Sequence, residues 1–436
     1  MKLSRRGFSR LLLSGAALGA ASLCTRDHTG SKAADHVRGG DGPLDAFLGK
    51  PFCEIRPVFE GSPPVREPYL AVATDGTVLV LRNYVGHLRR STDGGETWSD
   101  IIEVPIRHSD SNIIVDELTG DLLSLRLWQG EDKAFRSKDG GSTWVEEPVS
   151  VRLDGEMRWL EQAGLKHRTT RTSGEPGKSY YLHCNASESG LTLRYGKRPG
   201  RLIVTGTFRP HAKEHPSDRK PVDAIYSCAL YSDDRGKSWR VSELFPDGYT
   251  EEAAVVELSD GTLYFNTRSH RGFYEKERAR TLSAEHALRR EAWSTDEGHT
   301  WDNFRISRVL PDGGGYNRGY GMKGGLTRLP VRGRDILIYS NADTAGGQRE
   351  KLTIWASFDG GRTWPIKRLL YPGPSAYSSL GAGRPGTASE GKIFILFEGS
   401  LRHQYGAMQV ARFNLSWLLG GERTGDGDVP DWVRSS

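Results

Sequence analysis

Short apolar stretches recur along the chain, and turn residues separate each stretch from the next. Leu70 and Val72 occupy one face of a predicted strand. Val78 and Val80 occupy one face of the following strand, and Asp75-Gly76 is the turn between them. Alternation with a period of two is typical of β-strands, and Asp-Gly is a strong hairpin signal. Further strands are predicted at 255–258, 263–265, 336–339 and 393–397. The pattern therefore predicts an all-β protein.

An eight-residue segment occurs five times along the chain. Each copy fits Ser-x-Asp-x-Gly-x-Ser/Thr-Trp, and the copies are residues 91–98, 137–144, 232–239, 294–301 and 357–364. So many matches at fixed positions indicate an internal repeat. The aspartate accepts hydrogen bonds from amides in a tight turn, and the glycine permits a positive φ. We interpret these boxes as structural staples, with the Trp packed under the turn.

The spacing of the boxes predicts the number of repeats. Successive box aspartates are 46, 95, 62 and 63 residues apart. The 95-residue interval leaves room for a blade without a box, which we expect around 191–208. Radial arrays of such units are β-propellers. We therefore predict one six-bladed β-propeller with four-stranded antiparallel blades over residues 51–420, followed by a C-terminal tail at 421–436.

Few other segments depart from the strand pattern. Residues 157–163 and 284–293 are predicted to form short helices, and residues 209–220 a polar surface loop. No stretch after residue 24 is apolar enough to span a bilayer.

Residues 1–24 have the composition of an export signal. Four basic residues and no acidic residue accompany an apolar run that ends at Leu23. Arg5-Arg6 resembles the paired arginines of a bacterial twin-arginine signal, which implies a periplasmic or secreted protein. A short membrane anchor is the alternative. Cys24 is a poor match to a lipoprotein site because Leu23 stands where a small residue is expected. Residues 25–50 are polar and rich in glycine, which predicts a flexible leader.

Charge and cysteine content exclude two classes of protein. The formal net charge is +5, but the four basic residues of the signal supply most of it. Proteins that bind nucleic acid concentrate positive charge on the folded domain, so nucleic acid is not an expected partner. Without Cys24, three cysteines remain, at 53, 184 and 228. That number does not suit a disulfide scaffold, although one bridge is possible, and no Cys/His spacing suggests a zinc site.

Arginines lie beside strand-like segments at positions 66, 268 and 349. Their contexts resemble those of bacterial exo-sialidases, or neuraminidases. Arg66 begins Arg-Glu-Pro, which is similar to the Arg-Ile-Pro motif of that family. Arg268 and Arg349 flank strand-like segments similar to the second and third arginine segments. The resemblance covers about residues 55–415 and implies that the three arginines hold the substrate carboxylate. Guanidinium groups suit this role because they bind carboxylates with two parallel hydrogen bonds.

The same resemblance implies the reacting residues. Tyr377 resembles the nucleophilic tyrosine, and Glu252 has the spacing of the catalytic glutamate, with Glu251 as a rival. Glu398 resembles the glutamate that orients the first arginine. A carboxylate nucleophile would meet the substrate's own carboxylate at the same carbon. A phenol avoids that repulsion, and a neighbouring glutamate can take its proton.

One departure from the family concerns the general acid. The family's acid/base aspartate lies between the first arginine strand and the first box. Here that connection, residues 82–90, contains no aspartate. His87 within the connection or Asp110 from the next blade could replace the aspartate, or the acid is missing. General acid catalysis is typically worth ~10²–10⁴ in rate.

The leading hypothesis is an exported, sialidase-like, retaining glycosidase that removes terminal sialic acid or a related 2-keto acidic sugar. The missing aspartate motivates one alternative, a non-catalytic propeller that binds acidic glycans. The arginines would also suit a hydrolase or lyase of another acidic sugar. Sialylated or other acidic glycans are the expected partners, and this mechanism requires no metal or other cofactor. No oligomeric state is predicted.

Overall fold

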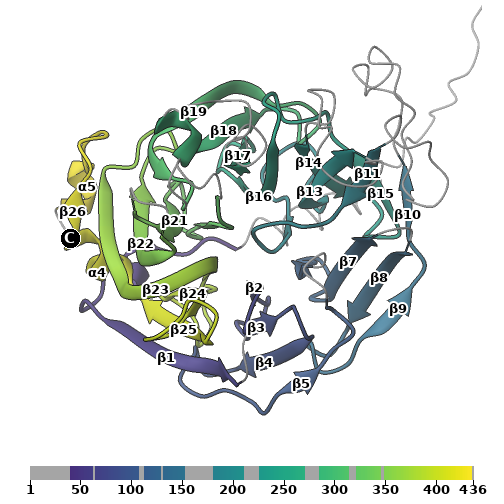
Figure 1. Cartoon of the computed structure of the whole chain (residues 1–436), viewed down its shortest axis with the longest axis horizontal. Coiled ribbons are helices and arrows are strands. Elements are labelled where there is room, and N and C mark those ends of the chain that lie inside the picture. Colours follow the sequence, from purple (N-terminus) through teal and green to yellow (C-terminus); the bar gives the residue numbers. More distant parts are fainter. Residues whose placement is uncertain are drawn as a thin grey trace, which may run out of the picture.

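Short β-sheets are arranged around a central axis in the structure, which is a computed structural model (Figure 1). The described residues are 40–61, 64–107, 112–128, 131–152, 180–210, 225–270, 284–313, 321–344 and 348–434. The prediction of an all-β propeller is confirmed.

Three of the sheets have four antiparallel strands each, as predicted. The first contains β2 (Pro68–Val72), β3 (Val78–Arg82), β4 (His87–Ser91) and β5 (Ile102–Glu103). The second contains β6 (Ile114–Val115), β7 (Leu122–Trp128), β8 (Glu131–Ser137) and β9 (Val145–Glu147). The third contains β16 (Thr250–Glu257), β17 (Leu263–Ser269), β18 (Leu288–Ser294) and β19 (Asp302–Pro311).

The other two sheets are larger than predicted. A six-stranded sheet contains β10 (Ser150–Arg152), β11 (Tyr180–His183), β12 (Leu191–Thr192), β13 (Leu202–Pro210), β14 (Tyr226–Ser232) and β15 (Ser238–Val241). Its β10 runs parallel to β15. An eight-stranded sheet contains β1 (Cys53–Glu60), β20 (Gly325–Arg328), β21 (Leu337–Ala342), β22 (Glu350–Ser357), β23 (Ile366–Ala382), β24 (Ile393–Gly399), β25 (Ala407–Phe413) and β26 (Glu422–Arg423). Among the described residues the strands thus form five hydrogen-bonded sheets rather than six separate four-stranded ones.

Two predictions about segments are wrong. Residues 191–208 do not form a separate blade, because β12 and β13 belong to the sheet that carries the third box. Of the predicted helix 284–293, only η5 (Ala284–Ala287) is helical, as one 3₁₀ turn. The remainder lies in β18, where hydrogen bonding to β17 and β19 on both sides outweighs helix propensity. Residues 157–163 and 211–220 lie outside the described part of the chain.

The boxes form the predicted turns. Asp93 accepts hydrogen bonds from the amides of Glu96 and Thr97, both 3.0 Å, and from the Ser91 hydroxyl at 2.7 Å. Gly95 adopts a φ of +85°. The Trp144 indole of the second box donates to a carbonyl of its own turn. The box aspartates therefore satisfy turn amides, as their structural interpretation requires.

The segments at the two ends of the propeller pack against it. Within the predicted leader, η1 (Leu44–Phe47) places Phe47 in the apolar core of the eight-stranded sheet. After β25 come α4 (Leu415–Leu419) and α5 (Asp431–Arg434), which places Val433 in that core. Residues 40–50 are thus part of the fold rather than a flexible leader, because Phe47 is almost completely buried.

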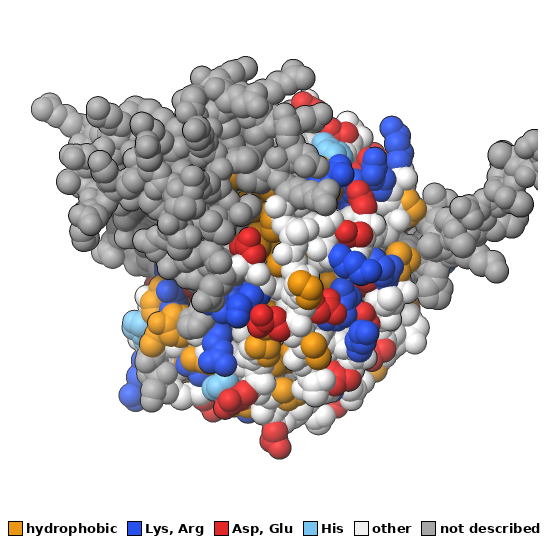
Figure 2. All heavy atoms as spheres, turned by 90° about the vertical axis from the view of Figure 1, so that its right-hand side faces the viewer, with side chains coloured by type: hydrophobic (Ala, Val, Ile, Leu, Met, Phe, Trp, Pro, Cys, Tyr) orange, Lys and Arg blue, Asp and Glu red, His pale blue; other side chains and the backbone are white. Residues whose placement is uncertain are grey.

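The surface carries mixed charges. Figure 2 shows acidic and basic side chains interspersed on the face that it displays, with apolar side chains scattered among them. None of the helices in the described ranges is long and apolar enough to cross a membrane. Cys53, Cys184 and Cys228 are free thiols.

Candidate active site

The predicted site residues lie at one end of the inner strands. Arg66 precedes β2, and Glu252 is near the start of β16, beside the end of β17 that carries Arg268. Tyr377 lies in the second half of β23, and Arg349 precedes β22. Residues separated by hundreds of positions therefore meet near the axis, because the strands that carry them come from three sheets and present the same end there.

Three arginines surround Tyr377. The guanidinium carbon of Arg66 is 5.0 Å from the centre of the tyrosine ring, and that of Arg349 is 5.1 Å from it. Arg268 donates a hydrogen bond from Nη1 to the phenol oxygen, 3.2 Å away. The ring itself is almost completely buried. The structure thus brings together all three arginines and the tyrosine that the sequence singled out.

Glu252, rather than its rival Glu251, contacts the phenol. The Tyr377 hydroxyl donates to Glu252 Oε1 at 3.4 Å, and the Arg268 guanidinium forms an ion pair with the same carboxylate. Glu251 Oε1 is 2.8 Å from His270 Nδ1 and 3.8 Å from Arg268 Nη1. The arrangement gives Glu252 access to the phenol proton and makes Glu251 a neighbour of the arginine.

A local irregularity of β16 aims Glu252. The register with β17 shifts between Glu251 and Ala254, which is the signature of a β-bulge. Glu252 has a φ of +51°, in the left-handed region that non-glycine residues rarely adopt. A bulge redirects a side chain that a regular strand would send elsewhere.

Glu398 connects the first arginine to the tyrosine segment. Its Oε1 accepts from the Glu67 amide at 2.8 Å and is 3.5 Å from Arg66 Nε, while Oε2 accepts from the Tyr377 amide at 3.1 Å. Burial raises the pKa of Glu398 to about 7, against the opposing effect of Arg66. The contact to Arg66 is the one that the sequence resemblance implied, and the contact to the Tyr377 backbone is additional.

A buried lysine is a site residue that sequence reasoning missed. Lys323 Nζ is 2.7 Å from Glu67 Oε2, donates to the Tyr69 hydroxyl at 3.1 Å, and lies 5.5 Å from the centre of the Tyr377 ring. Burial tends to raise the pKa of Glu67, but Lys323 and Arg66 outweigh it and lower that pKa. The two glycines that follow the lysine were the signal in the sequence that this segment is tightly packed. A Cβ at Gly324 would come within 2.7 Å of the Tyr339 hydroxyl, so only glycine fits there.

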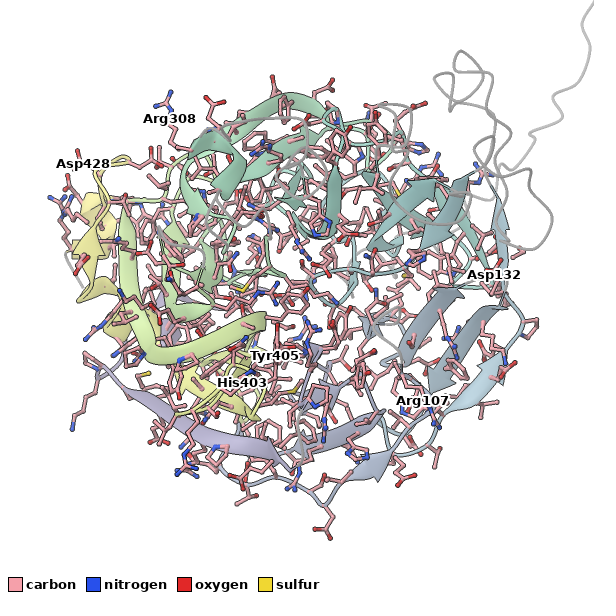
Figure 3. All side chains as sticks on the ribbon, viewed as in Figure 1. Arg107, Asp132, Arg308, His403, Tyr405 and Asp428 are labelled. Atoms are coloured by element: carbon pink, nitrogen blue, oxygen red, sulfur yellow. The ribbon has the colours of Figure 1, made fainter. Side chains whose placement is uncertain are left out.

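Tyr405 is a second residue that the sequence did not reveal. Its hydroxyl accepts a hydrogen bond from Arg349 Nη1 at 2.7 Å, and its ring lies 4.6 Å from the Arg66 guanidinium. Figure 3 shows Tyr405 beside the inner end of the last strands, close to His403. One tyrosine therefore orients two of the three arginines.

Of the two candidate acids only His87 lies within the described residues, and it is not joined to this cluster. His87 lies on β4, the third strand of its sheet, opposite Glu103 of β5. Desolvation and the nearby Arg82 lower its pKa. Among the described residues no hydrogen bond or ion pair links His87 to Tyr377 or to the three arginines. Asp110 lies outside the described part of the chain.

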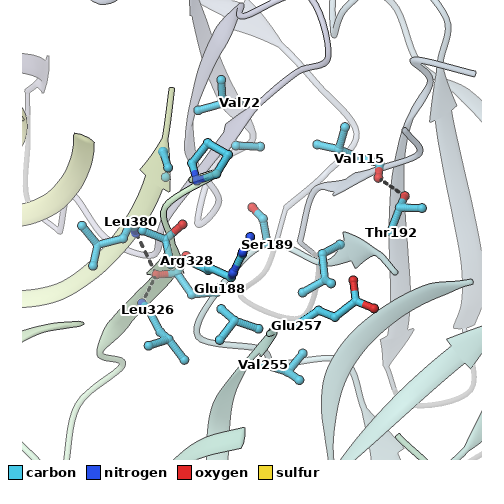
Figure 4. A pocket seen from close by; sticks show the side chains of 18 of the residues that line it. Val72, Val115, Glu188, Ser189, Thr192, Val255, Glu257, Leu326, Arg328 and Leu380 are labelled. Carbon is cyan, nitrogen blue, oxygen red and sulfur yellow. Dashed lines mark hydrogen bonds between the residues drawn. The ribbon is translucent and has the colours of Figure 1, made fainter. Parts of the chain in front are cut away.

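A cavity of about 170 Å³ occupies the axis beyond these residues (Figure 4). It is lined by later parts of the inner strands, including Leu70, Val255 and Leu380, and none of the predicted site residues lines it. Glu188 at its wall accepts hydrogen bonds from Leu326 and Leu380. In the described portion no group of three or more His, Cys, Asp or Glu side chains could hold a metal ion.

Comparison with known proteins gives a repeat family and several sialidases. Residues 89–100 match the BNR/Asp-box repeat. A sialidase of Micromonospora viridifaciens is 31% identical over 390 residues, which cover 83% of this chain and 53% of that protein. A sialidase of Bacteroides fragilis is 28% identical over 341 residues, which cover 72% of this chain and 54% of that protein. The chain spans about half the length of these two relatives.

Solved structures show the same fold. The Hadza microbial sialidase Hz136 has a TM-score of 0.55 at 20% identity, covering 80% of this chain and 66% of that chain. The intramolecular trans-sialidase of Ruminococcus gnavus has a TM-score of 0.55 at 16% identity, covering 81% and 95%. Identities this low support the propeller fold and nothing finer.

Proposed function

Because this chain belongs to the bacterial sialidase family, we propose that it is a sialidase-like glycoside hydrolase that removes terminal sialic acid, or a related 2-keto acidic sugar, from glycans. One observation carries the proposal. Arg66, Arg268 and Arg349 converge on Tyr377, whose hydroxyl contacts Glu252. An anionic sugar with its carboxylate on the anomeric carbon needs cations and a nucleophile at one place.

The arginines bind the substrate in this proposal. Sialic acid carries a carboxylate on its anomeric carbon, and each guanidinium can donate two hydrogen bonds to it. With the carboxylate held over the Tyr377 ring, the anomeric carbon lies within reach of the phenol oxygen. Positioning of this kind lowers the entropic part of the barrier.

Tyr377 and Glu252 perform the displacement. The phenol oxygen forms a bond to the anomeric carbon as the bond to the leaving-group oxygen breaks, and the phenol proton moves to the Glu252 carboxylate. Arg268 contacts both the phenol oxygen and Glu252, so it stabilises negative charge on either. Water then attacks the anomeric carbon from the face that the leaving group vacated, opposite the tyrosine, as the bond to the phenol oxygen breaks and Glu252 returns the proton to the phenol. Two inversions give net retention.

The leaving-group oxygen needs a proton of its own. Asp110 remains a candidate acid, and His87 would need to approach the substrate from the third strand of its sheet. Without an acid, natural sugars, which are poor leaving groups, react slowly. Aryl leaving groups need little protonation, so they separate the nucleophilic machinery from the acid.

The test is turnover of two α-sialosides by the purified protein, one with an aryl leaving group and one with a natural sugar. We expect the aryl substrate to be cleaved with retention, and Tyr377→Phe to abolish its turnover while circular dichroism stays unchanged. Similar efficiency on both substrates would identify a working acid, which Asp110→Asn and His87→Gln then locate. Turnover by Tyr377→Phe equal to that of wild type would exclude the tyrosine as nucleophile.

A non-catalytic glycan-binding propeller is the second candidate. It is favoured by the short β3–β4 connection, which lacks an aspartate. It predicts binding of sialic acid, weakened by Arg349→Ala, with no product from either sialoside after long incubation. Cleavage of a uronate-containing polysaccharide but of no sialoside would instead support another acidic sugar as the substrate.

Two structural and cellular points belong to the same proposal. The first half of β23 pairs with β22 and the second half with β24, so the eight-stranded sheet is interpreted as two blades and the propeller as six-bladed. A crystal structure counts the blades directly.

Export by residues 1–24 is tested by fusing these residues to a reporter protein. The double substitution Arg5→Lys and Arg6→Lys should block export of the reporter.

A further inference from the structure

A five-residue segment crosses the axis directly behind the candidate active site. Residues 186–190 lie in the connection between β11 and β12, and we name them the axial peg. The Ala186 carbonyl accepts from the Tyr69 hydroxyl at 2.8 Å, and the Ser189 hydroxyl donates to the Leu70 carbonyl at 2.8 Å. The Gly190 amide donates to the Ile113 carbonyl at 2.9 Å. A segment of one sheet thereby touches two neighbouring sheets.

The axial peg also bonds two strands of the eight-stranded sheet. One is β23, which carries Tyr377, and the other is β20, which begins shortly after Lys323. The Glu188 carboxyl accepts from the amides of Leu326 at 2.8 Å and Leu380 at 2.7 Å. Its other oxygen is 2.6 Å from the hydroxyl of Ser379, two residues after Tyr377. Figure 4 shows, at the wall of the axial cavity, the hydrogen bonds that Glu188 accepts from Leu326 and Leu380.

The contacts of greatest consequence are those of Ser187 with the bulge of β16. The Ser187 amide donates to the Ala253 carbonyl at 2.7 Å, and its hydroxyl donates to the carbonyl of Glu252. Thr205 of β13 adds a bond of 2.6 Å to the Ala253 carbonyl. Both carbonyls of the bulge are therefore fixed by groups outside β16 and β17.

These bonds fall where the backbone is least favourable. Glu252 has a positive φ, and a residue in that region persists only when its surroundings over-determine it. Ser187 is fully buried, so no water replaces its hydroxyl if the side chain is removed. The side chain of Glu252 in turn contacts Arg268 and the Tyr377 hydroxyl.

We propose that the axial peg sets the orientation of Glu252 relative to Tyr377, and that Ser187 is a positioning residue for proton transfer from the phenol. The inference rests on the proposed function, because the role of Glu252 as proton acceptor is part of it. Ser187 does not touch the substrate. It acts through the Glu252 backbone, so its loss affects the chemical step more than substrate binding.

Kinetics of Ser187→Ala on the aryl sialoside test the proposal. We expect kcat to fall about 10²-fold with KM little changed, because a small misplacement of a catalytic group has effects of that size. The pH dependence of kcat should also change, because displacement of Glu252 weakens its ion pair with Arg268. Ser187→Thr keeps the hydroxyl and should restore most of kcat.

Two further variants separate positioning from stability. Thr205→Val removes only the second bond to the Ala253 carbonyl and should reduce kcat less than Ser187→Ala. Ser242→Ala removes a buried serine that accepts a hydrogen bond from the Ala229 amide, 13 positions away, and in the described part of the chain touches none of the site residues, so it should lower stability without lowering kcat. Equal kcat in Ser187→Ala and wild type would overturn the proposal.

A crystal structure of Ser187→Ala tests the positioning role of the axial peg without any measurement of turnover. Displacement of Glu252 from Arg268 and Tyr377 supports the axial peg as the positioning element. An unchanged positive φ and unchanged contacts of Glu252 would overturn it. If wild type cleaves neither sialoside, the proposed function fails, and the crystal structure still decides whether the peg orients Glu252.

Discussion

The three arginines around Tyr377 differ in the charges that surround them. Arg66 lies 3.4 Å from Glu67 and 3.5 Å from Glu398, and Arg268 pairs with Glu252. Within the described residues, Arg349 has no carboxylate at ion-pair distance, and its bonds go to the Tyr405 hydroxyl and the Gly321 carbonyl. The positive charge of Arg349 is the least neutralised of the three, so we expect it to attract an anionic ligand most strongly.

Arg349→Ala should therefore weaken substrate binding most clearly. We expect kcat/KM to fall about 10²-fold, since loss of one partner of a buried charge pair costs roughly 2–5 kcal/mol. Most of the loss should appear in KM and in the Kd of sialic acid, measured by calorimetry. Arg349→Lys should lose less, because it keeps the charge but not the paired donors. An unchanged Kd in Arg349→Ala would exclude a carboxylate contact.

Sequence reasoning found the residues that have recognisable neighbours and missed those that do not. Arg66, Arg268, Arg349, Tyr377 and Glu252 lie in segments that resemble a family, and the structure brings them together. Lys323 bonds Glu67, which is 256 positions away in the sequence, and no local sequence pattern indicates such a pair. The choice between Glu251 and Glu252 was equally invisible, because it depends on a bulge of one strand.

At the scale of elements, local patterns predicted turns better than they predicted the limits of sheets. The box fixes its turn through its own residues, so five copies could be recognised without knowing what they pack against. The long interval between the second and third boxes was misinterpreted, because length alone does not say whether extra residues form a blade or insertions. Residues 288–293 were misassigned for a related reason, since hydrogen bonds from distant strands decide their structure.

Asp359→Ala should destabilise the protein by about 1–3 kcal/mol, because it leaves the hydrogen-bond donors of a partly buried turn without their acceptor. Asp359 accepts from the Thr363 amide at 2.9 Å and hydroxyl at 2.6 Å, and from the Ser357 hydroxyl at 2.8 Å. Asp260→Ala is the matched control, since within the described residues Asp260 accepts a single, exposed hydrogen bond, from the Thr262 amide. Urea unfolding measures both. Equal effects would show that the box aspartate has no special structural role.

At the scale of the whole molecule, a single carboxyl at the axis joins two sheets: Glu188, between β11 and β12 of the six-stranded sheet, bonds β20 and β23 of the eight-stranded one. Burial raises the pKa of Glu188 to about 8, while its bonds to Ser379 and to backbone amides oppose the shift. The folded-state pKa is above the ordinary value, so folding favours the protonated form. Stability from this group is complete below about pH 4.5 and is lost as the pH rises through 8.

Glu188→Gln should remove this pH dependence. We expect wild type to lose up to a few kcal/mol of unfolding free energy between pH 5 and pH 9, whereas the variant, which carries no ionisable group there, should lose much less. Chemical unfolding at a series of pH values measures the difference. Parallel curves for the two proteins would mean that Glu188 does not titrate in this range.

The pairing of β1 with β25 sets the order in which the molecule can fold. Cys53 lies opposite Phe413, so the first strand and one of the last complete the same sheet. Until β25 exists, β1 has no partner, and the early sheets fold as an open arc. Closing so long a loop costs entropy before any contact repays it. A growing chain therefore carries an unpaired strand through most of its synthesis, and any truncation before β25 leaves that edge open to pairing between molecules.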